Sequence, residues 1–444
     1  MSTESESPRE KTWSRRKLIA AMGTTAAGLM LGGGLKSAAA APVSPPGQPS
    51  FGNAPGWVNV KDYGAKGNGF AHENDASAIR AAMEVAGRGR FGGTVYFPAG
   101  TYMIDSSLVL LSKVRLVGDG IGASTIKSIR SGIPLLLGNQ VKMATIEHLS
   151  LEGHGLVPGG ELVERGVDLK DCEQVVVRNC SFYWIVNGIG VRTSRGVTIE
   201  HCSFDTMVPV EAASQGYGIF LEGGERHIVA NNRFTQLDKP CIYITAGSSY
   251  SSIVNNVASS CKASLITVSS PIQPCSRLRI EGNQVTAAGL SKGDTSCRQG
   301  IVLRGYCTDN VIAGNMVARA AEAGIALEGD AAAKTERPTG NLITGNQIVD
   351  CPAGVTLVNS DANTVTGNDV RRAKTGISLS VLGEKDGSFC LDNVVTGNAL
   401  FRCSEAGIRI ASKRCQSTGV FGNGGSGNGE AVADSGQDTV RSGF

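Results

Sequence analysis

A ten-residue phrase occurs three times in the second half of the chain, at unequal intervals. The copies read NLITGNQIVD, NTVTGNDVRR and NVVTGNALFR, and they begin at Asn341, Asn363 and Asn393. The intervals between them are 22 and 30 residues. A repeat that tolerates insertions of this size must place them outside its packed core. The pattern therefore favours small stacked units over a duplicated globular domain.

Weaker copies of the phrase continue upstream and align on the second residue of the GN pair. Positions two and five residues later are apolar in every copy from the first to the ninth, which supports the alignment. Because Asn tolerates left-handed backbone and its amide can bond an Asn above and below, the column predicts an Asn ladder at a tight bend. The aligned residues are Cys180, Cys202, Asn232, Asn256, Asn283, Asn315, Asn346, Asn368, Asn398 and Asn423.

A second phrase, GIxL, lies between the copies and alternates apolar and polar residues as a short strand does. Each unit then holds about three short strands and no helix, so the units must stack to bury their apolar faces. The sequence predicts an all-β fold, a right-handed parallel β-helix of about ten coils over 114–429, with rungs about 4.8 Å apart. We expect the variable lengths to be outward loops, mostly after the GIxL strand. Residues 430–444 are predicted to be a flexible tail.

The N-terminus resembles a twin-arginine export signal. Ser14–Gly23 reads SRRKLIAAMG, and an A-x-A cleavage site follows near Ala40. Residues 1–41 are thus predicted to be a signal peptide and 42–56 a linker, which implies a secreted or periplasmic protein. Without 1–41 the chain has 36 basic and 36 acidic residues, so we expect no nucleic-acid partner. The glycine-rich run after the arginines is a poor spanning helix, so we expect no stable membrane insertion.

The positions of several cysteines indicate that these residues do not form disulfides. Cys261, Cys351 and Cys403 share a column with Ala, Leu and Met, which indicates small core residues. The remaining loop-like positions leave room for bridges: Cys275, Cys297, Cys307, Cys390 and Cys415.

The segment 57–113 is predicted to hold a cap on the first coil and the entry strands of the stack. Apolar residues at Ile79, Ala82, Met83 and Ala86 follow helical spacing, and Asn74 or Asp75 can begin that helix. The phrases VKDYGAKGNG, NDASAIRAAMEVA, GGTVYFPAGTY and LVGDGIGASTI resemble the pectate-lyase-like β-helix superfamily, which includes polysaccharide lyases, polygalacturonase-type hydrolases and phage tailspikes. The resemblance implies a capped β-helix. The acidic pairs typical of polygalacturonases, an N-x-D followed by D-D, are absent from this sequence. The D-P-H phrase of alginate epimerases is absent too, so no catalytic residue of the family carries over.

The outward positions of the GIxL strands predict a trough for an extended, possibly uronic-acid-containing polysaccharide. Charged and aromatic residues concentrate in its first four rungs, and a second patch lies at Arg304 and Glu328. The alternative is a solvated ladder of charges. The predicted catalytic residues are Asp168, Arg192 and Glu222, with Glu222 as general acid or metal ligand. The predicted substrate-binding residues are Lys170, Tyr217, Phe220, Lys239 and Tyr243.

Two mechanisms fit this trough. A lyase needs a base beside a uronate and a cation, either Arg or Lys or a Ca²⁺ ion, to neutralise the carboxylate. A hydrolase needs two carboxylates; Asp168 and Glu222 lie two rungs apart, about 9.6 Å by rung spacing, near the inverting range. Arg192 would serve the substrate or Glu222. A non-catalytic glycan-binding or cell-surface structural protein is the alternative, and either a monomer or a trimer is compatible with the repeat.

The export signal is directly testable. Changing Arg15→Lys together with Arg16→Lys should leave the protein uncleaved in the cytoplasm, because the transport route reads the paired guanidinium groups. Cell fractionation and the mass of the mature protein provide the measurement. Unchanged secretion of the double variant would contradict the twin-arginine assignment.

Overall fold

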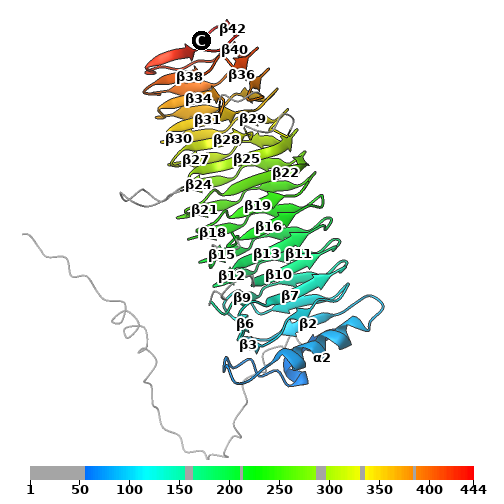
Figure 1. The fold of residues 1–444 in the computed structure, drawn as a ribbon. Coiled ribbons are helices and arrows are strands. Elements are labelled where there is room, and N and C mark those ends of the chain that lie inside the picture. Colours follow the sequence, from blue (N-terminus) through cyan, green and yellow to red (C-terminus); the bar gives the residue numbers. More distant parts are fainter. Residues whose placement is uncertain (1–55, 156–163, 211–213, 287–296, 331–335, 384–386) are drawn as a thin grey trace, which may run out of the picture. The chain divides into compact units, whose positions relative to one another are not determined.

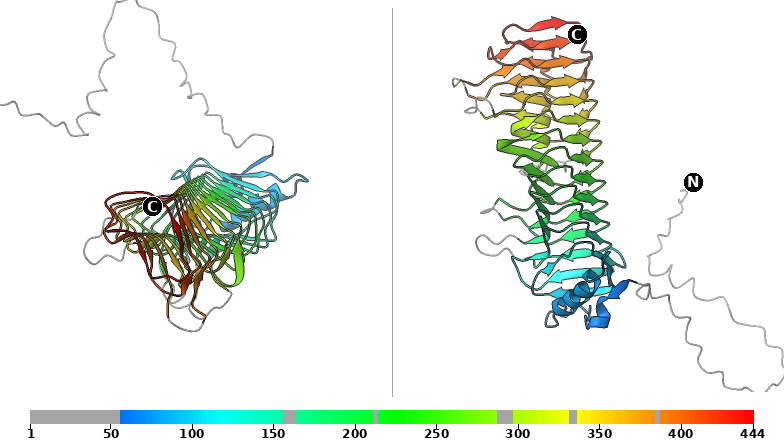
Figure 2. Two further views of the ribbon diagram at one scale, coloured as in Figure 1. Left: turned by 90° about the horizontal axis from the view of Figure 1, so that it is seen from above. Right: turned by 90° about the vertical axis from the view of Figure 1, so that its right-hand side faces the viewer.

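The protein is a stack of coils in which three long parallel sheets surround one core (Figures 1 and 2). The computed structural model describes residues 56–155, 164–210, 214–286, 297–330, 336–383 and 387–444. The predicted signal peptide and nearly all of the predicted linker therefore lie outside the described residues. Every pairing between neighbouring strands of the three sheets is parallel, as coil-on-coil stacking requires. The predicted parallel β-helix is confirmed.

Sheet A contains fifteen strands in the described residues and runs along the whole stack. Its strands are β1 (Trp57–Asn59), β2 (Thr94–Phe97), β5 (Arg115–Gly118), β8 (Thr145–Glu147), β11 (Val176–Arg178), β14 (Thr198–Glu200), β17 (Ile228–Ala230), β20 (Ser252–Val254), β23 (Arg279–Glu281), β26 (Val311–Ala313), β29 (Leu342–Thr344), β32 (Thr364–Thr366), β36 (Val394–Thr396), β40 (Gly419–Phe421) and β42 (Val440–Ser442).

Sheet B contains twelve strands in the same described ranges. They are β3 (Gly100–Ile104), β6 (Ser124–Ser128), β9 (Ser150–Glu152), β12 (Ser181–Tyr183), β15 (Ser203–Asp205), β18 (Arg233–Thr235), β21 (Val257–Ser259), β24 (Gln284–Thr286), β27 (Met316–Ala318), β30 (Gln347–Val349), β33 (Asp369–Arg371) and β37 (Ala399–Phe401).

Sheet C is formed by the GIxL strands and contains thirteen strands among the residues described. They are β4 (Leu108–Val109), β7 (Pro134–Asn139), β10 (Arg165–Lys170), β13 (Asn187–Arg192), β16 (Ile219–Glu222), β19 (Ile242–Thr245), β22 (Ile266–Ser276), β25 (Gln299–Thr308), β28 (Ala323–Glu328), β31 (Ala353–Val358), β34 (Thr375–Ser380), β38 (Ala406–Ile410) and β41 (Glu430–Asp434). A small extra sheet pairs β35 (Cys390–Leu391) with β39 (Cys415–Gln416).

The stack is longer at both ends than the repeat predicts. β1 and β2 already belong to sheet A, so the entry strands expected in 57–113 are themselves part of the coils. At the other end β41 pairs with β38, and β42 pairs with β40. The prediction of a flexible tail at 430–444 is therefore wrong. The last strands are mostly exposed, so they lack the apolar pattern that marks the inner coils.

The predicted capping helix is α2 (Ala76–Gly87), which contacts β1, β2, β3 and β4 at the first coil (Figure 1). A short 3₁₀ helix, η2 (Val60–Tyr63), contacts it. The Asp75 carboxylate accepts hydrogen bonds from the backbone N–H groups of Lys66, Gly67 and Met103. It therefore joins three segments at the end of the stack, a larger role than that of a helix cap.

The predicted Asn ladder is present at the corner between sheets A and B. Asn346 Nδ2 donates to Asn368 Oδ1 at 2.8 Å, and Asn315 Nδ2 donates to Asn346 Oδ1 at 2.9 Å. We expected the ladder Asn itself to take the left-handed backbone, and it does not. The residue before it does: Gly345 has φ 62° and Asn231 has φ 57°. The two residues of the GN pair thus have different roles. Gly takes the left-handed bend, and the Asn side chain points inward and bonds to the Asn of the next coil.

A second Asn ladder, not predicted, stabilises the corner between sheets C and A. Asn310, Asn341 and Asn363 each donate from Nδ2 to Oδ1 of the next Asn, and Asn393 receives the last bond. These residues open the same ten-residue phrase that marks the repeat. Long connections occur at this corner and also between sheets B and C, so the expected location of the insertions was only partly right.

All twelve cysteines are buried free thiols. Cys275, Cys307, Cys390 and Cys415 lie on strands and pair in register as Cys275 with Cys307 and Cys390 with Cys415. The prediction that they lie in loops is therefore wrong. The chain at these positions continues the coil and points its small side chains into the core. Burial raises the pKa of the Cys307 thiol, which keeps it protonated.

The ladder predicts a large cost for losing one Asn. Asn346→Ala removes the acceptor of the Asn315 N–H and Nδ2 groups and the donor to Ile312 O. Buried groups left without partners should lower the free energy of unfolding by about 3 kcal/mol. Denaturant unfolding measures this. The exposed neighbour Gln347→Ala is the control and should change stability by no more than about 0.5 kcal/mol; equal effects of both would contradict the ladder.

Candidate functional site

Four neighbouring strands of sheet C, β10, β13, β16 and β19, form the floor of the predicted trough. Their register aligns Asp168, Gly190, Phe220 and Tyr243 in one outward column. It aligns Lys170, Arg192, Glu222 and Thr245 in a second. The structure thus places the side chains that the repeat predicts on adjacent rungs.

Asp168 is buried rather than open to solvent, because two arginines cover it. Its side chain faces out of the sheet, yet the residue is only 4% exposed. Arg192 Nη2 donates to both Asp168 oxygens, at 3.0 and 2.9 Å. Arg165 Nη1 lies 3.5 Å from Asp168 Oδ2. We expected Arg192 to serve either the substrate or Glu222. The pairing with Glu222 is not formed, and Asp168 is instead the shared partner of the two arginines.

Gly190 makes this arrangement fit. It stands next to Asp168 in the column, and an added Cβ would lie 3.0 Å from Arg165 Cδ and 3.2 Å from its Nε. A side chain at Gly190 would therefore require Arg165 to shift by a few tenths of an ångström. A missing side chain on the middle rung leaves room for the guanidinium groups to lie against the carboxylate.

Arg165 is a residue of the site that the sequence pattern missed. Period-two alternation puts it on the same side as Val167 and Leu169, which face the core. The alternation does not hold where the chain enters β10, and the Arg165 side chain is 20% exposed. Burial lowers the pKa of the Arg165 guanidinium, an effect that Asp168 partly opposes and Arg192 reinforces. The Nε groups of Arg165 and Arg192 are buried without a hydrogen-bond partner.

Three aromatic rings stack beside the charged cluster. The ring centroids of Tyr217 and Tyr243 are 4.8 Å apart, and those of Phe220 and Tyr243 are 5.8 Å apart. Tyr217 is buried, and its hydroxyl donates to Ser214 O at 2.7 Å. Burial raises the pKa of Tyr217 to about 12. Tyr217 therefore supports the half-buried rings of Phe220 and Tyr243, which are open to a ligand.

Asn187, also not predicted, fixes the turn that carries Tyr217. Its Oδ1 accepts hydrogen bonds from the backbone N–H groups of Gly216 and Tyr217, at 3.0 and 2.9 Å. The stem of Lys239 lies against Gly216, where an added Cβ would be 2.9 Å from Lys239 Cγ. Lys170 is exposed at the end of β10. All the predicted binding residues are thus on or beside the same four rungs.

Glu222 differs from Asp168 in having no fixed partner. Its carboxylate is half-buried and makes no hydrogen bond or ion pair within the described part of the chain. It is one rung from Arg192, and its charge acts on Arg165. Glu222 is therefore an available carboxylate beside two cations.

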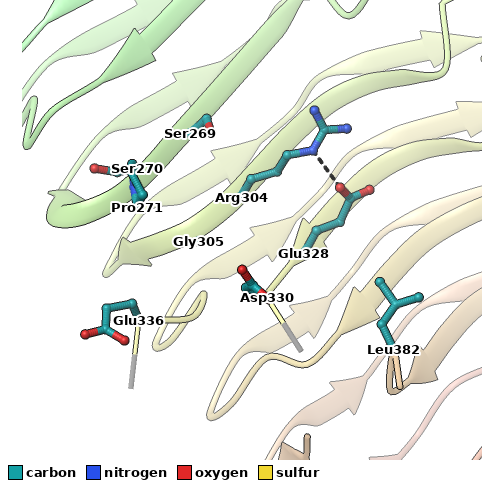
Figure 3. A pocket seen from close by; sticks show the side chains of 10 residues that line it. Ser269, Ser270, Pro271, Arg304, Gly305, Glu328, Asp330, Glu336 and Leu382 are labelled. Carbon is teal, nitrogen blue, oxygen red and sulfur yellow. Dashed lines mark hydrogen bonds and ion pairs between the residues drawn. The ribbon is translucent and has the colours of Figure 1, made fainter. Parts of the chain in front are cut away.

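The second predicted patch, at Arg304 and Glu328, lines a pocket of about 380 Å³ further along sheet C (Figure 3). Arg304 Nε donates to Glu328 Oε2 at 2.6 Å, and Gln299 Nε2 lies 3.2 Å from the other Glu328 oxygen. Asp330 and Glu336 line the same pocket beyond the strand ends. Three carboxylates and one guanidinium therefore line the pocket, the reverse of the balance in the trough.

Two features of the described residues concern metal and membrane binding. No group of three or more His, Cys, Asp or Glu side chains there is placed to hold a metal ion. Among those residues no helix is both long and apolar enough to cross a membrane.

Comparison with known families identifies the scaffold. Residues 57–285 match the model of the family described as rhamnogalacturonase A/epimerase, pectate lyase-like, which covers half of the chain. The chain belongs to this family. Residues 272–441 match the right-handed β-helix region. Together the two matches confirm the predicted superfamily, the handedness and the extension of the coils beyond residue 429.

Among curated proteins, the chain is similar to two different kinds of relative. It is 31% identical over 186 residues to the plasmin and fibronectin-binding protein A of Streptococcus pneumoniae, covering 40% of this chain and 24% of that protein. It is 32% identical over 152 residues to the mannuronan C5-epimerase AlgE3 of Azotobacter vinelandii, covering 28% and 8%. The matches span a quarter or less of these relatives.

Among solved structures, the fold is shared more widely than the sequence. The A-module of the Azotobacter vinelandii mannuronan C-5 epimerase AlgE6 superposes with a TM-score of 0.58 and 18% identity, covering 86% of this chain and 98% of that one. A tailspike protein of Escherichia coli bacteriophage HK620, solved with a pentasaccharide, has a TM-score of 0.63 and 14% identity, covering 86% and 80%. At these identities the likeness shows the fold.

A buried acid at the edge of the trough predicts a pH-dependent stability. Glu164 precedes β10, is 1% exposed and accepts a hydrogen bond from His154 N at 3.0 Å. Burial raises the pKa of Glu164 from 4.5 to about 7, and the bond from His154 opposes this only in part. The folded state therefore holds a proton that the unfolded chain has released between those two values.

The stabilisation that comes from the proton on Glu164 is complete below pH 4.5 and is lost as the pH rises towards 7. Glu164→Gln cannot ionise, so its unfolding free energy should fall less across this window than that of the wild type, by at most about 3 kcal/mol. Denaturant unfolding at pH 5 and pH 8 measures the difference. Parallel pH profiles of the two proteins would contradict a protonated Glu164.

Proposed function

We propose that the trough binds a uronate-containing polysaccharide and removes the proton next to the uronate carboxylate. The observation that carries this proposal is the convergence of Arg165 and Arg192 on one side of Gly190, with the unpaired carboxylate of Glu222 on the next rung. Cations that bind a carboxylate and a base that takes the neighbouring proton are the two requirements of this chemistry.

The charge and shape of the trough suit an acidic glycan. Four basic residues, Lys170, Arg165, Arg192 and Lys239, stand against two acidic ones, Asp168 and Glu222. The half-buried rings of Phe220 and Tyr243 are available to contact sugar rings. Since a sugar residue is about as long as one rung, successive sugars of an extended chain would meet successive strands of the sheet.

The reaction begins when Glu222 takes the C5 proton. The electron pair of the C–H bond moves towards the uronate carboxylate, whose added charge the guanidinium groups of Arg165 and Arg192 stabilise. Asp168 keeps both guanidinium groups in place through its ion pairs. Two outcomes are then open. In the first, the electron pair forms the C4=C5 double bond as the C4–O4 bond breaks, and the proton held by Glu222 passes to the leaving oxygen, which gives an unsaturated uronate. In the second, water gives a proton to the opposite face of C5, which yields the epimer, and Glu222 releases its proton to solvent.

The comparisons support this class of reaction. The mannuronan C5-epimerases act at the carbon where the proposed proton transfer occurs, and they share both sequence segments and the coil architecture. The D-P-H phrase of alginate epimerases is absent, so the residues proposed here are this chain's own. We further propose that the protein is exported, so that it meets its substrate outside the cytoplasm.

Metal dependence follows from the same geometry. Arg165 and Arg192 supply the positive charge that a Ca²⁺ ion would otherwise bring to the substrate carboxylate. Turnover measured with and without EDTA distinguishes the arginines from a bound Ca²⁺ ion as the source of positive charge. We expect turnover to persist in the presence of the chelator.

A second candidate function is hydrolysis in the pocket near Arg304. It is favoured by the three carboxylates Glu328, Asp330 and Glu336, because glycoside hydrolysis uses a pair of them. This acidic lining suits a neutral glycan. Release of reducing ends that Glu336→Gln abolishes and Glu222→Gln leaves intact would support this candidate over the first.

The proposed base gives the sharpest test. Glu222→Gln should lower kcat by at least about 100-fold on an acidic polysaccharide that the wild type converts, because a neutral amide cannot accept the proton. Ultraviolet absorbance detects the unsaturated product, and incorporation of solvent deuterium at C5 detects the epimer. Glu200→Gln, on sheet A, is the control and should retain full turnover.

Full turnover by Glu222→Gln would overturn the proposed base. A wild type that binds the polysaccharide without either product would instead support the non-catalytic glycan-binding alternative.

A further inference from the structure

A row of charged turns lies at the corner between sheets B and C, in the last coils. Arg319, Asp350, Arg372 and Arg402 each form a one-residue bend with left-handed φ of 62°, 57°, 54° and 55°. They occupy successive coils, because Arg319 N bonds Val349 O, Asp350 N bonds Arg371 O and Arg372 N bonds Phe401 O. Their exposed side chains therefore form a line along the stack.

In the earlier coils that the structure describes at this corner, the bend residue is uncharged. The same bend in earlier coils is formed by Trp184, Thr206, Gln236 and Ser260, which also have left-handed φ. None of these four side chains is charged. The turn itself therefore does not require Arg, and the basic residues have no role in forming the bend.

The balance of charge at the corner is positive. Arg372 pairs with Asp350 at 2.6 and 3.0 Å, and Arg371 pairs with Asp369 at 2.7 Å. The nearby Glu405 pairs with Arg409, which lies on β38. Three further basic residues, Arg319, Lys374 and Arg402, make no ion pair in the described residues. Five basic residues thus stand against the two acidic residues at 350 and 369.

These side chains surround a hollow with a small apolar floor. The hollow has a volume of about 600 Å³, and its floor includes Ala320, Pro352 and Ala373. A neighbouring hollow of about 310 Å³ is lined by Arg371, Phe401 and Arg402. The Arg371 guanidinium lies over the Phe401 ring, 5.4 Å from its centroid. Cations along the rim of a groove with a shallow floor suit an extended anionic chain.

We propose that this basic corner, formed by Arg319, Arg371, Arg372, Lys374 and Arg402, is a second binding surface for an acidic polysaccharide. Arg319 and Arg402 are three rungs apart, about 14 Å at the usual strand spacing, so several sugar residues of one chain could lie between them. The corner is on a different edge and in later coils than the trough. We name a polysaccharide, and not another polyanion, as the ligand because the proposed function of the trough is to bind one.

The test compares two triple variants with the same change of charge. The first carries Arg319→Gln, Lys374→Gln and Arg402→Gln. The control carries Lys113→Gln, Arg233→Gln and Lys413→Gln, which are exposed residues elsewhere on the described surface. Affinity electrophoresis in gels that contain alginate or polygalacturonate gives the Kd, and a gel with a neutral glucan corrects for mobility.

We expect the corner variant to bind the acidic polymers at least about tenfold more weakly at low salt, with a smaller salt dependence. The control variant should bind like the wild type, and both should unfold at the wild-type temperature. Turnover of short oligosaccharides in the trough should be unchanged in the corner variant. Equal weakening of both variants, or wild-type binding by the corner variant, would overturn the proposal.

Failure of the two proposals can be told apart. If no acidic polysaccharide is converted, the trough chemistry fails, while corner-dependent retention in the gel still supports the second surface. Duplex DNA and vesicles with anionic lipid are the comparison ligands. Corner-dependent binding to either of them, without binding to the polysaccharides, would overturn the assignment of the ligand.

Discussion

The whole structure depends on the stacking of one coil directly on the next. The strands bond only to strands in neighbouring coils, so no coil can satisfy its backbone alone. The two Asn ladders extend this bonding around the corners, where the chain turns too tightly for a sheet. A single continuous core from Val60 to Val420 results, and the stacked rings of Phe182, Phe204 and Phe234 show how closely equivalent positions superpose.

Stacking also determines how surface sites can arise. A residue at one position of a coil lies beside the residue at the same position of the next coil, so neighbours on the surface of sheet C are 22 to 35 residues apart in sequence. The trough, the acidic pocket and the basic corner are three such columns. Each has its own charge: positive with a free Glu222 in the trough, negative around Glu328, and positive again beside Arg372. One scaffold thus offers surfaces for different ligands without any change in the core.

The sequence predicted the register well because inward positions cannot tolerate polar side chains. Two apolar columns and the Asn column are enough to place Lys170, Arg192 and Glu222 on adjacent rungs, where the structure has them. The pattern failed where the periodicity stops. Arg165 enters the site where β10 begins, and Cys390 and Cys415 lie on short strands outside the repeated phrase.

Sequence alone determined the coil architecture, the capping helix and the family, because these follow from periodic burial and from local turn chemistry. Only the tertiary structure decided which charges meet. Arg192 could have turned to Glu222 on one side or to Asp168 on the other, since both lie one rung or so away. In the structure Arg192 bonds both Asp168 oxygens, and Arg165 reaches the same carboxylate across Gly190. That choice depends on side-chain volume in three neighbouring coils, which no one-dimensional pattern records, and it leaves Glu222 free.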